Sequence, residues 1–248
     1  MDVHLRDEFL RLWRRYFGEA EFPIVFYYTN AEQDAEPADA PTGHRCLIAA
    51  LSQVRRGRAL RFDAGSIGCG GARRYLGFSD EIMPDFEDFL SSGAPGTLSG
   101  KRYKRSPELV RELLKRTPTF SAPARFIVFK RWDVLGESDD PEAVIFFAHP
   151  DVASGLFTLA NFDEAEPNGV FSPSASGCAS IVQYPHLEGE SKRPRAVLGL
   201  FDVSARAHVQ SDVFTFSVPM DKFRRMIEQM EESFLATHSW TKVSGRTV

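Results

Sequence analysis

Five short runs of almost continuous apolar residues constrain the fold of this chain more than any other feature of its sequence. They hold much of its phenylalanine, which is abundant at 21 residues against 6 tyrosines and 3 tryptophans. Apolar runs of this length, without polar alternation, are typical of strands buried on both faces, as in a sheet that helices cover. The runs are residues 22–28, 125–129, 143–147, 196–201 and 213–218.

Helical patterns lie between these runs. Residues 3–17 place their apolar side chains on one stripe, and residues 45–56 repeat that pattern. Ser106 followed by a proline predicts the start of another helix, and Pro219 predicts the start of a final one. Strands and helices thus alternate loosely, and we expect an α/β or α+β fold with a mixed, mostly buried sheet covered by helices.

The chain, residues 1–248, is expected to form a single domain. Residues 31–42, rich in proline and acidic side chains, are expected to form an exposed loop that acts as a lid. Residues 135–141 contain Gly, Ser and Asp in turn patterns, and two lobes sharing one core would meet there.

Charge and composition exclude some classes of function. The net charge is −4, with basic and acidic residues intermixed, so the chain offers no single-sign field for nucleic acid or an anionic membrane. The polar N-terminal segment lacks the apolar run of a signal peptide, and the chain has three cysteines, an odd number. These features predict a cytoplasmic protein with free or ligand-bound thiols.

The three cysteines carry the strongest chemical hint. Cys46, Cys69 and Cys178 each stand in or after a turn containing glycine, and each is expected at the start of a helix, where the helix dipole favours a thiolate. Cys69, between Gly68 and Gly70, is the strongest candidate for a thiolate of low pKa. The alternative is a tight turn in which Cys69 is a small buried filler.

If the three thiols converge, they would hold a soft metal ion or an iron–sulfur cluster with one coordination position open. The sequence does not establish that they converge, because it contains no C-x-x-C pair. A nucleophilic role for Cys69 or Cys178 is a weaker alternative, because no cysteine-protease signature is present. A zinc site could be completed by His44, His149 or His186.

The glycine-rich turn also suggests binding of a small anionic metabolite, with the cysteines as bystanders. Consecutive backbone N–H groups in such a turn form an anion-binding concavity, and arginines follow it. The glycines do not follow the G-x-G-x-x-G order of a dinucleotide site. A second group of polar residues follows a buried strand, where α/β folds place ligand contacts. The candidate ligand-binding residues are Gly68, Gly70, Gly71, Arg73, Arg74, Asp202, Ser204 and Arg206.

Several motifs together resemble the Domain of Unknown Function 169 family of uncharacterised prokaryotic proteins. The resemblance covers most of the chain, and it implies no established activity and no catalytic residue. The motifs are Cys46-Leu47-Ile48-Ala49-Ala50, Gly68-Cys69-Gly70-Gly71-Ala72, Tyr75-Leu76-Gly77-Phe78, Ser176-Gly177-Cys178 with Tyr184-Pro185, Asp202-Val203-Ser204-Ala205-Arg206 and Phe216-Ser217-Val218-Pro219.

Three classes of function stay open on the sequence alone: a metal or cluster protein that uses the three thiols, a protein that binds a small anionic metabolite, and an interaction module without a pocket. Neither the substrate, the reaction nor the oligomeric state follows from the residues.

Overall fold

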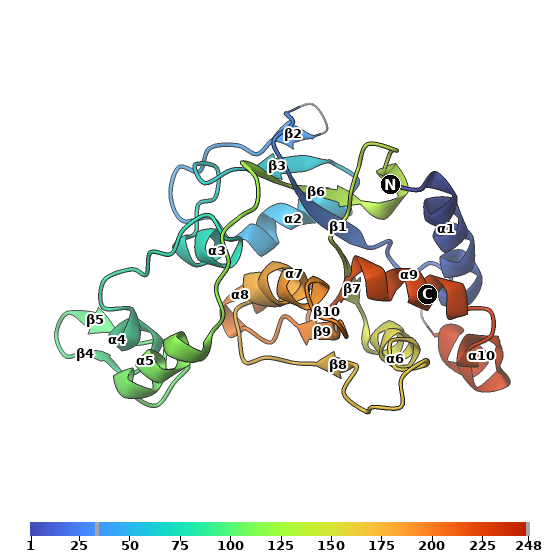
Figure 1. Ribbon diagram of the computed structural model, residues 1–248. Coiled ribbons are helices and arrows are strands. Elements are labelled where there is room, and N and C mark those ends of the chain that lie inside the picture. Colours follow the sequence, from blue (N-terminus) through green and yellow to red (C-terminus); the bar gives the residue numbers. More distant parts are fainter. Residues whose placement is uncertain (33–34, 247–248) are drawn as a thin grey trace.

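One eight-stranded sheet organises the part of the chain that the structure, a computed structural model, describes: residues 1–32 and 35–246 (Figure 1). Its strands lie in the order β2-β3-β6-β1-β7-β10-β9-β8. The strands are β1 (Ile24–Thr29), β2 (Glu36–Pro37), β3 (Leu60–Phe62), β6 (Phe126–Arg131), β7 (Ala143–Ala148), β8 (Val170–Phe171), β9 (Ala196–Gly199) and β10 (Phe214–Pro219).

The sheet is mixed, as predicted, and the two kinds of pairing are segregated. The interior pairs are antiparallel, whereas β2 pairs with β3 and β8 pairs with β9 in parallel at the two edges. The five apolar runs of the sequence become β1, β6, β7, β9 and β10. The α/β fold with a buried sheet is therefore confirmed.

Both faces of the sheet are covered, which explains why the apolar runs lack alternation. In β7, Val144 and Phe146 pack into one hydrophobic core, whereas Ala143, Ile145 and Phe147 pack into the other. Successive side chains of a strand point to opposite faces, so a strand between two cores needs an apolar residue at every position.

Helices form the two outer layers (Figure 1). One core is closed by α1, α6, α9 and α10 and the 3-10 turns η1 and η3, and the other by α2, α3, α8 and the π-helix η2, which continues into α7. Their bounds are α1 (Val3–Phe17), α6 (Pro150–Leu159), α9 (Met220–Gln229), α10 (His238–Ser244), η1 (Trp132–Val134), η3 (Phe234–Ala236), α2 (Leu47–Arg55), α3 (Gly70–Tyr75), α8 (Val203–Arg206), η2 (Ala179–Gln183) and α7 (Tyr184–Gly189).

Two helices differ from the sequence-based expectation. The helix that begins after Pro219 is α9, but it is not the last one, because α10 follows it. Helix α6 was not anticipated, because apolar residues such as the exposed Phe157 lie on its outer side as well as on its buried side and blur the helical period.

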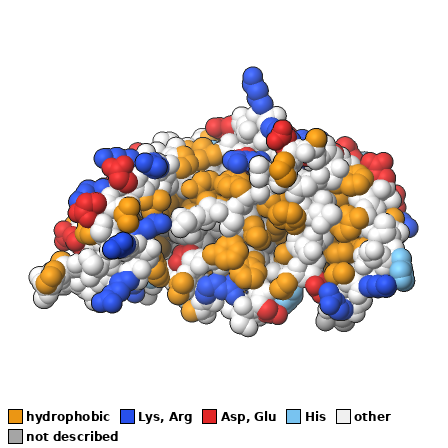
Figure 2. Space-filling view, turned by 90° about the horizontal axis from the view of Figure 1, so that it is seen from below, with side chains coloured by type: hydrophobic (Ala, Val, Ile, Leu, Met, Phe, Trp, Pro, Cys, Tyr) orange, Lys and Arg blue, Asp and Glu red, His pale blue; other side chains and the backbone are white. Residues whose placement is uncertain are grey.

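A small unit projects from the body at the lower left of Figure 1. Lys and Arg side chains gather on its surface at the left of Figure 2, whereas apolar side chains are prominent across the middle of that face. The unit consists of α4 (Phe86–Leu90), β4 (Gly93–Ala94), β5 (Leu98–Ser99) and α5 (Pro107–Arg116).

The predicted lid and the predicted junction of two lobes both adjoin strands of the sheet. Residues 135–141 connect η1 to β7, and the existence of two lobes there stays a prediction. The predicted lid, residues 31–42, contributes β2 to the sheet edge, and its residues 33 and 34 lie outside the described residues. Within the described part of the chain, no helix is long and apolar enough to cross a membrane.

A buried ion pair joins β6 to the loop between η1 and β7. The carboxylate of Asp139, which is fully buried, accepts hydrogen bonds from the Lys130 ammonium at 2.6 Å and the Gly136 amide at 2.8 Å. The Tyr27 hydroxyl also donates to it. Removing one member of such a pair leaves the other charge buried and uncompensated.

We therefore expect Asp139→Ala to lower the free energy of unfolding by about 3–5 kcal/mol, because it strands the Lys130 ammonium in the core. Urea unfolding of the full chain measures this loss. Arg246→Ala is the control, because it removes an ion pair to Asp151 that is open to solvent and should cost far less. A loss for Asp139→Ala no larger than that of the control would contradict the assignment.

Gly155 lets α6 approach the aromatic layer. A Cβ atom at this position would lie 2.4 Å from a ring carbon of Trp240 and 2.9 Å from one of Phe17. A glycine-to-alanine change inside a helix normally stabilises it by up to about 1 kcal/mol. At position 155 we expect the opposite sign, because a large ring has to move.

The measurement compares the melting temperatures of Gly155→Ala and Gly189→Ala. Gly189 ends α7 and has open space where its Cβ would lie, which makes it the matched control. Gly155→Ala should melt below the unaltered chain and Gly189→Ala at or above it. Equal melting temperatures for the two variants would show that the α6 contact tolerates a side chain.

Candidate functional site

Each cysteine stands at the start of a helix, as predicted. Cys46 precedes α2 and Cys69 precedes α3, both with extended backbone, and neither thiol makes a side-chain capping hydrogen bond. Cys178 precedes η2 but already has helical backbone angles. The cap of that helix is Ser176, whose hydroxyl accepts a hydrogen bond from the Ala179 amide at 3.2 Å.

Gly68 brings the first two cysteine segments together. The Arg45 amide donates to the Gly68 carbonyl at 3.2 Å, so the residues just before Cys46 and Cys69 are hydrogen-bonded neighbours. A Cβ atom at Gly68 would lie 2.7 Å from the Cβ of Pro41 and 2.9 Å from the Gly43 carbonyl oxygen. Only a residue without a side chain allows this approach of the two loops.

Two further glycines let the segment that contains Cys178 pack closely against α2 and β9. A Cβ atom at Gly177 would lie 3.4 Å from Ile48 of α2, which places the segment of Cys178 against the helix that follows Cys46. A Cβ atom at Gly199 of β9 would lie 2.3 Å from Ser180, so η2 rests directly on this strand. Glycines thus permit the close approaches that gather the three segments.

The three thiols belong to one core. Cys178 is buried in the cluster around α2 and α3, and Cys46 and Cys69 are half-buried against it. Burial raises the pKa of the Cys178 thiol well above its ordinary value, and the negative charges of Cys69 and Cys46 raise this pKa further. The Cys178 thiol therefore lies within electrostatic range of both Cys46 and Cys69.

The raised pKa corrects one expectation. A helix start was expected to favour the Cys178 thiolate, but the loss of hydration outweighs the dipole of a short helix, and the folded protein favours the neutral thiol. In residues 1–32 and 35–246, no group of three or more His, Cys, Asp or Glu side chains has an arrangement that would hold a metal ion. The thiols share one hydrophobic core without forming a ready coordination site.

Asp202 connects α8 to the third cysteine segment. Its carboxylate caps α8 by accepting hydrogen bonds from the amide of Ser204 at 3.0 Å and from its hydroxyl at 2.8 Å. The same carboxylate accepts a hydrogen bond from the Gly177 amide at 3.3 Å. Its negative charge also contributes to the raised pKa of Cys178.

The predicted ligand-binding arginines differ in how many hydrogen bonds their guanidinium groups donate to backbone carbonyls. Arg206 donates to the carbonyls of Val213, Gln210 and Ser211, and its guanidinium lies 5.0 Å from the centre of a phenylalanine ring. Arg74 donates to the Asp80 carbonyl at 2.6 Å. The anion-binding role of these arginines stays a prediction.

The other predicted residues of the glycine-rich turn lie in α3. Gly70 and Gly71 are its first two residues; a Cβ atom at Gly70 would have open space, and one at Gly71 would make ordinary van der Waals contact with Tyr75 and Cys69. Arg73 is exposed, and within the described part of the chain its guanidinium has no hydrogen bond or ion pair.

Two of the three histidines named for a zinc site already have carboxylate partners. His149 lies 3.0 Å from Asp212, and His186 lies 2.7 Å from Glu142. The ring of His186 also stacks on Phe120 with 4.2 Å between centroids. His44 is exposed.

The structure adds two tyrosines to the surroundings of the thiols. Burial raises the pKa of Tyr75, at the end of α3, against a lowering influence of Arg74, and the charges of Cys178, Tyr184 and Asp202 raise it further. Burial also raises the pKa of Tyr184, the first residue of α7. Both tyrosines occur in the family motifs, which is the signal that would have singled them out.

The π-helix is a feature that no sequence pattern indicated. Gln183, its last residue, is fully buried and donates from Nε2 to the Pro118 carbonyl at 2.6 Å. Its Oε1 atom has no hydrogen-bond partner among the described residues. Single turns of π-helix occur frequently at functional sites.

A comparison with protein families gives one match. The model of DUF169, described as "Uncharacterised ArCR", matches residues 15–229. This range includes all three cysteine segments and the sheet that carries them. No curated protein and no solved structure matches the chain.

The buried thiol makes the stability of the protein depend on pH. The pKa of Cys178 is raised in the folded chain, whereas the unfolded chain ionises near the ordinary value of 9.0. Above that pH the unfolded state gains a thiolate that the folded state resists, so stability should fall as the pH rises above about 9. We expect Cys178→Ala to weaken this loss.

The measurement is the free energy of unfolding in urea at about pH 7.5 and about pH 9.5. Val182→Ala is the matched control, since it truncates a buried side chain of the same π-helix without removing a titratable group. A pH dependence that is identical in the two variants would contradict the raised pKa.

Proposed function

The chain belongs to the DUF169 family of uncharacterised proteins, and we propose that Cys46, Cys69 and Cys178 form a thiolate site for a soft metal ion or an iron–sulfur cluster. Thiolates are the ligands that zinc, copper(I) and iron–sulfur clusters prefer in proteins. Three protein thiolates leave one coordination position of a tetrahedral centre for water or a substrate atom.

The observation that carries the proposal is that all three thiols pack into or against one hydrophobic core. The charges of Cys69 and Cys46 raise the pKa of Cys178, so three thiolates in this place repel one another. A bound cation reverses the sign of that interaction, because it attracts all three charges at once. Metal binding would therefore release the proton that the folded protein keeps on Cys178.

The proposal requires small rotations of side chains. Cys46 and Cys69 are half-buried, and their thiols make no capping hydrogen bonds that would have to break when the side chains change rotamer. Cys178 is buried and would form the fixed wall of the site. The surrounding Tyr75 and Tyr184, whose pKa values are raised, would stay protonated and supply hydroxyl donors to bound sulfide or thiolate.

The anionic-metabolite alternative has less support in its sequence-based form, because Arg74 and Arg206 already donate to backbone carbonyls. We also propose that the protein works in a reducing compartment such as the cytoplasm. All three cysteines are free, and a thiolate site functions only while its thiols stay reduced.

The test is purification of the full chain without oxygen, followed by measurement of iron, acid-labile sulfide, zinc and copper per chain. We expect one metal or cluster per chain, with visible charge-transfer absorbance if the metal is iron. Each of Cys46→Ser, Cys69→Ser and Cys178→Ser should weaken metal binding by more than about tenfold, since each removes a ligand.

Lys242→Ala is the control variant, because this exposed lysine lies in α10, beyond the opposite face of the sheet. It should bind as much metal as the unaltered chain. The proposal fails if the anaerobic protein contains no metal and cannot be loaded with ferrous iron and sulfide, zinc or copper(I). It fails equally if the three serine variants bind as much metal as the control.

A further inference from the structure

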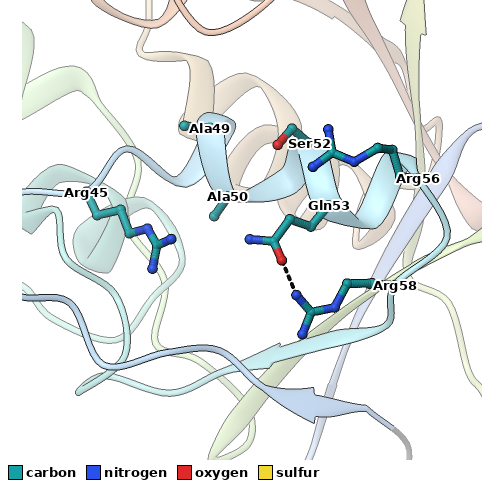
Figure 3. Close-up of a pocket in the computed structure, with 7 residues that line it drawn as sticks. All are labelled: Arg45, Ala49, Ala50, Ser52, Gln53, Arg56 and Arg58. Atoms are coloured by element: carbon teal, nitrogen blue, oxygen red, sulfur yellow. Dashed lines mark hydrogen bonds between the residues drawn. The ribbon is translucent and has the colours of Figure 1, made fainter.

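A cavity of about 470 Å³ runs along the outer side of α2, and three of its seven lining residues are arginines (Figure 3). Arg45 precedes the helix, Arg56 follows it, and Arg58 precedes β3. Ser52 and Gln53 supply polar groups between them. The lining contains no carboxylate, which is notable in a chain whose net charge is −4.

Most of this positive charge is weakly compensated. Among the residues that the structure describes, the Arg45 guanidinium has one ionic partner, Asp39 at 3.8 Å, and that aspartate side chain is 83% exposed. The guanidinium of Arg56 has no hydrogen bond or ion pair within residues 1–32 and 35–246. Arg58 bonds to Glu36 and to the side-chain oxygen of Gln53. Arg55, in contrast, lies outside the lining and is fully engaged by Glu21, with two bonds of 2.7 Å.

The side chains are placed to hold a ligand from two ends. Figure 3 shows the guanidinium groups of Arg45 and Arg58 reaching toward each other below α2, with Gln53 between them. Arg56 lies beside Ser52 on the upper side of the helix. Two guanidinium groups that face each other across a cavity suit an anion with a charged group at each end.

The small side chain of Ala50 leaves space in the cavity. It is only partly exposed, and Figure 3 shows it between Arg45 and Gln53. A cavity of this volume falls within the range of about 300–1,000 Å³ that is usual for small-molecule sites. Guanidinium groups bind phosphate oxygens through paired, charge-assisted hydrogen bonds, and hydroxyl and amide groups can complete the set.

From these contacts we propose that the cavity binds a small molecule that carries two or more linked phosphate groups. One phosphate group contacts Arg45 and the next contacts Arg58, because these are the two guanidinium groups that reach toward each other below α2. Binding exchanges the solvent around Arg45 for phosphate oxygens. The site uses none of the three thiols, so it is independent of the proposed metal site.

The probe is inorganic pyrophosphate, titrated into the full chain at low ionic strength and followed by calorimetry. Arg45→Ala and Arg58→Ala should each weaken its binding roughly tenfold, because each removes a charge-assisted contact. Ala50→Leu should also weaken it, by filling the cavity without altering the charge. Both arginines are exposed, so these variants should fold normally.

Arg116→Ala is the matched control, because Arg116 is an exposed arginine at the end of α5 that makes no hydrogen bond or ion pair among the described residues. It should leave pyrophosphate binding unchanged. The inference is overturned if pyrophosphate does not bind, if Arg45→Ala and Arg58→Ala have no effect, or if Arg116→Ala weakens binding equally. Succinate binding as tightly as pyrophosphate would also overturn it, by identifying a site for dicarboxylates.

Discussion

The structure depends on burial of the central strands on both faces. In β7, all six residues are buried, and alternate side chains enter two separate hydrophobic cores. Each core needs a layer of helices above it, since neither face of the strand can be left in water. The placement of α1, α6 and α9 on one side and of α2, α3 and η2 on the other follows from this requirement.

The cysteine segments are positioned by the packing of the second helical layer. Helices α2 and α3 and the π-helix η2 all rest on the same face, and Gly68, Gly177 and Gly199 have no side chain where neighbouring segments approach most closely. The cysteines lie at the starts of these helices, where the chain turns from loop to helix. Helix α2 follows Cys46 of the proposed thiolate site and has the cavity with three arginines along its outer side.

Local patterns predicted much of this arrangement. The apolar runs located β1, β6, β7, β9 and β10, and the glycine turns located the starts of α2, α3 and η2. Three features escaped them for physical reasons. Helix α6 is apolar beyond one face, the edge strands β2 and β8 have two residues each, and the π-helix differs from an α-helix only in its hydrogen bonds. Arg45, Arg56 and Arg58 gave no periodic signal, because their significance depends on the space between them.

Local patterns were enough to give the α/β class, the strands β1, β6, β7, β9 and β10, the family and the positions of the cysteines at helix starts, because each depends on residues close together in the chain or on motifs in order. The three-dimensional packing alone shows that Cys46 and Cys69 influence Cys178, and that burial disfavours the Cys178 thiolate. It also shows that Arg206 donates to backbone carbonyls, whereas Arg56 makes no hydrogen bond or ion pair within the described part of the chain. Electrostatics and hydration depend on distances between segments far apart in sequence, which no local pattern contains.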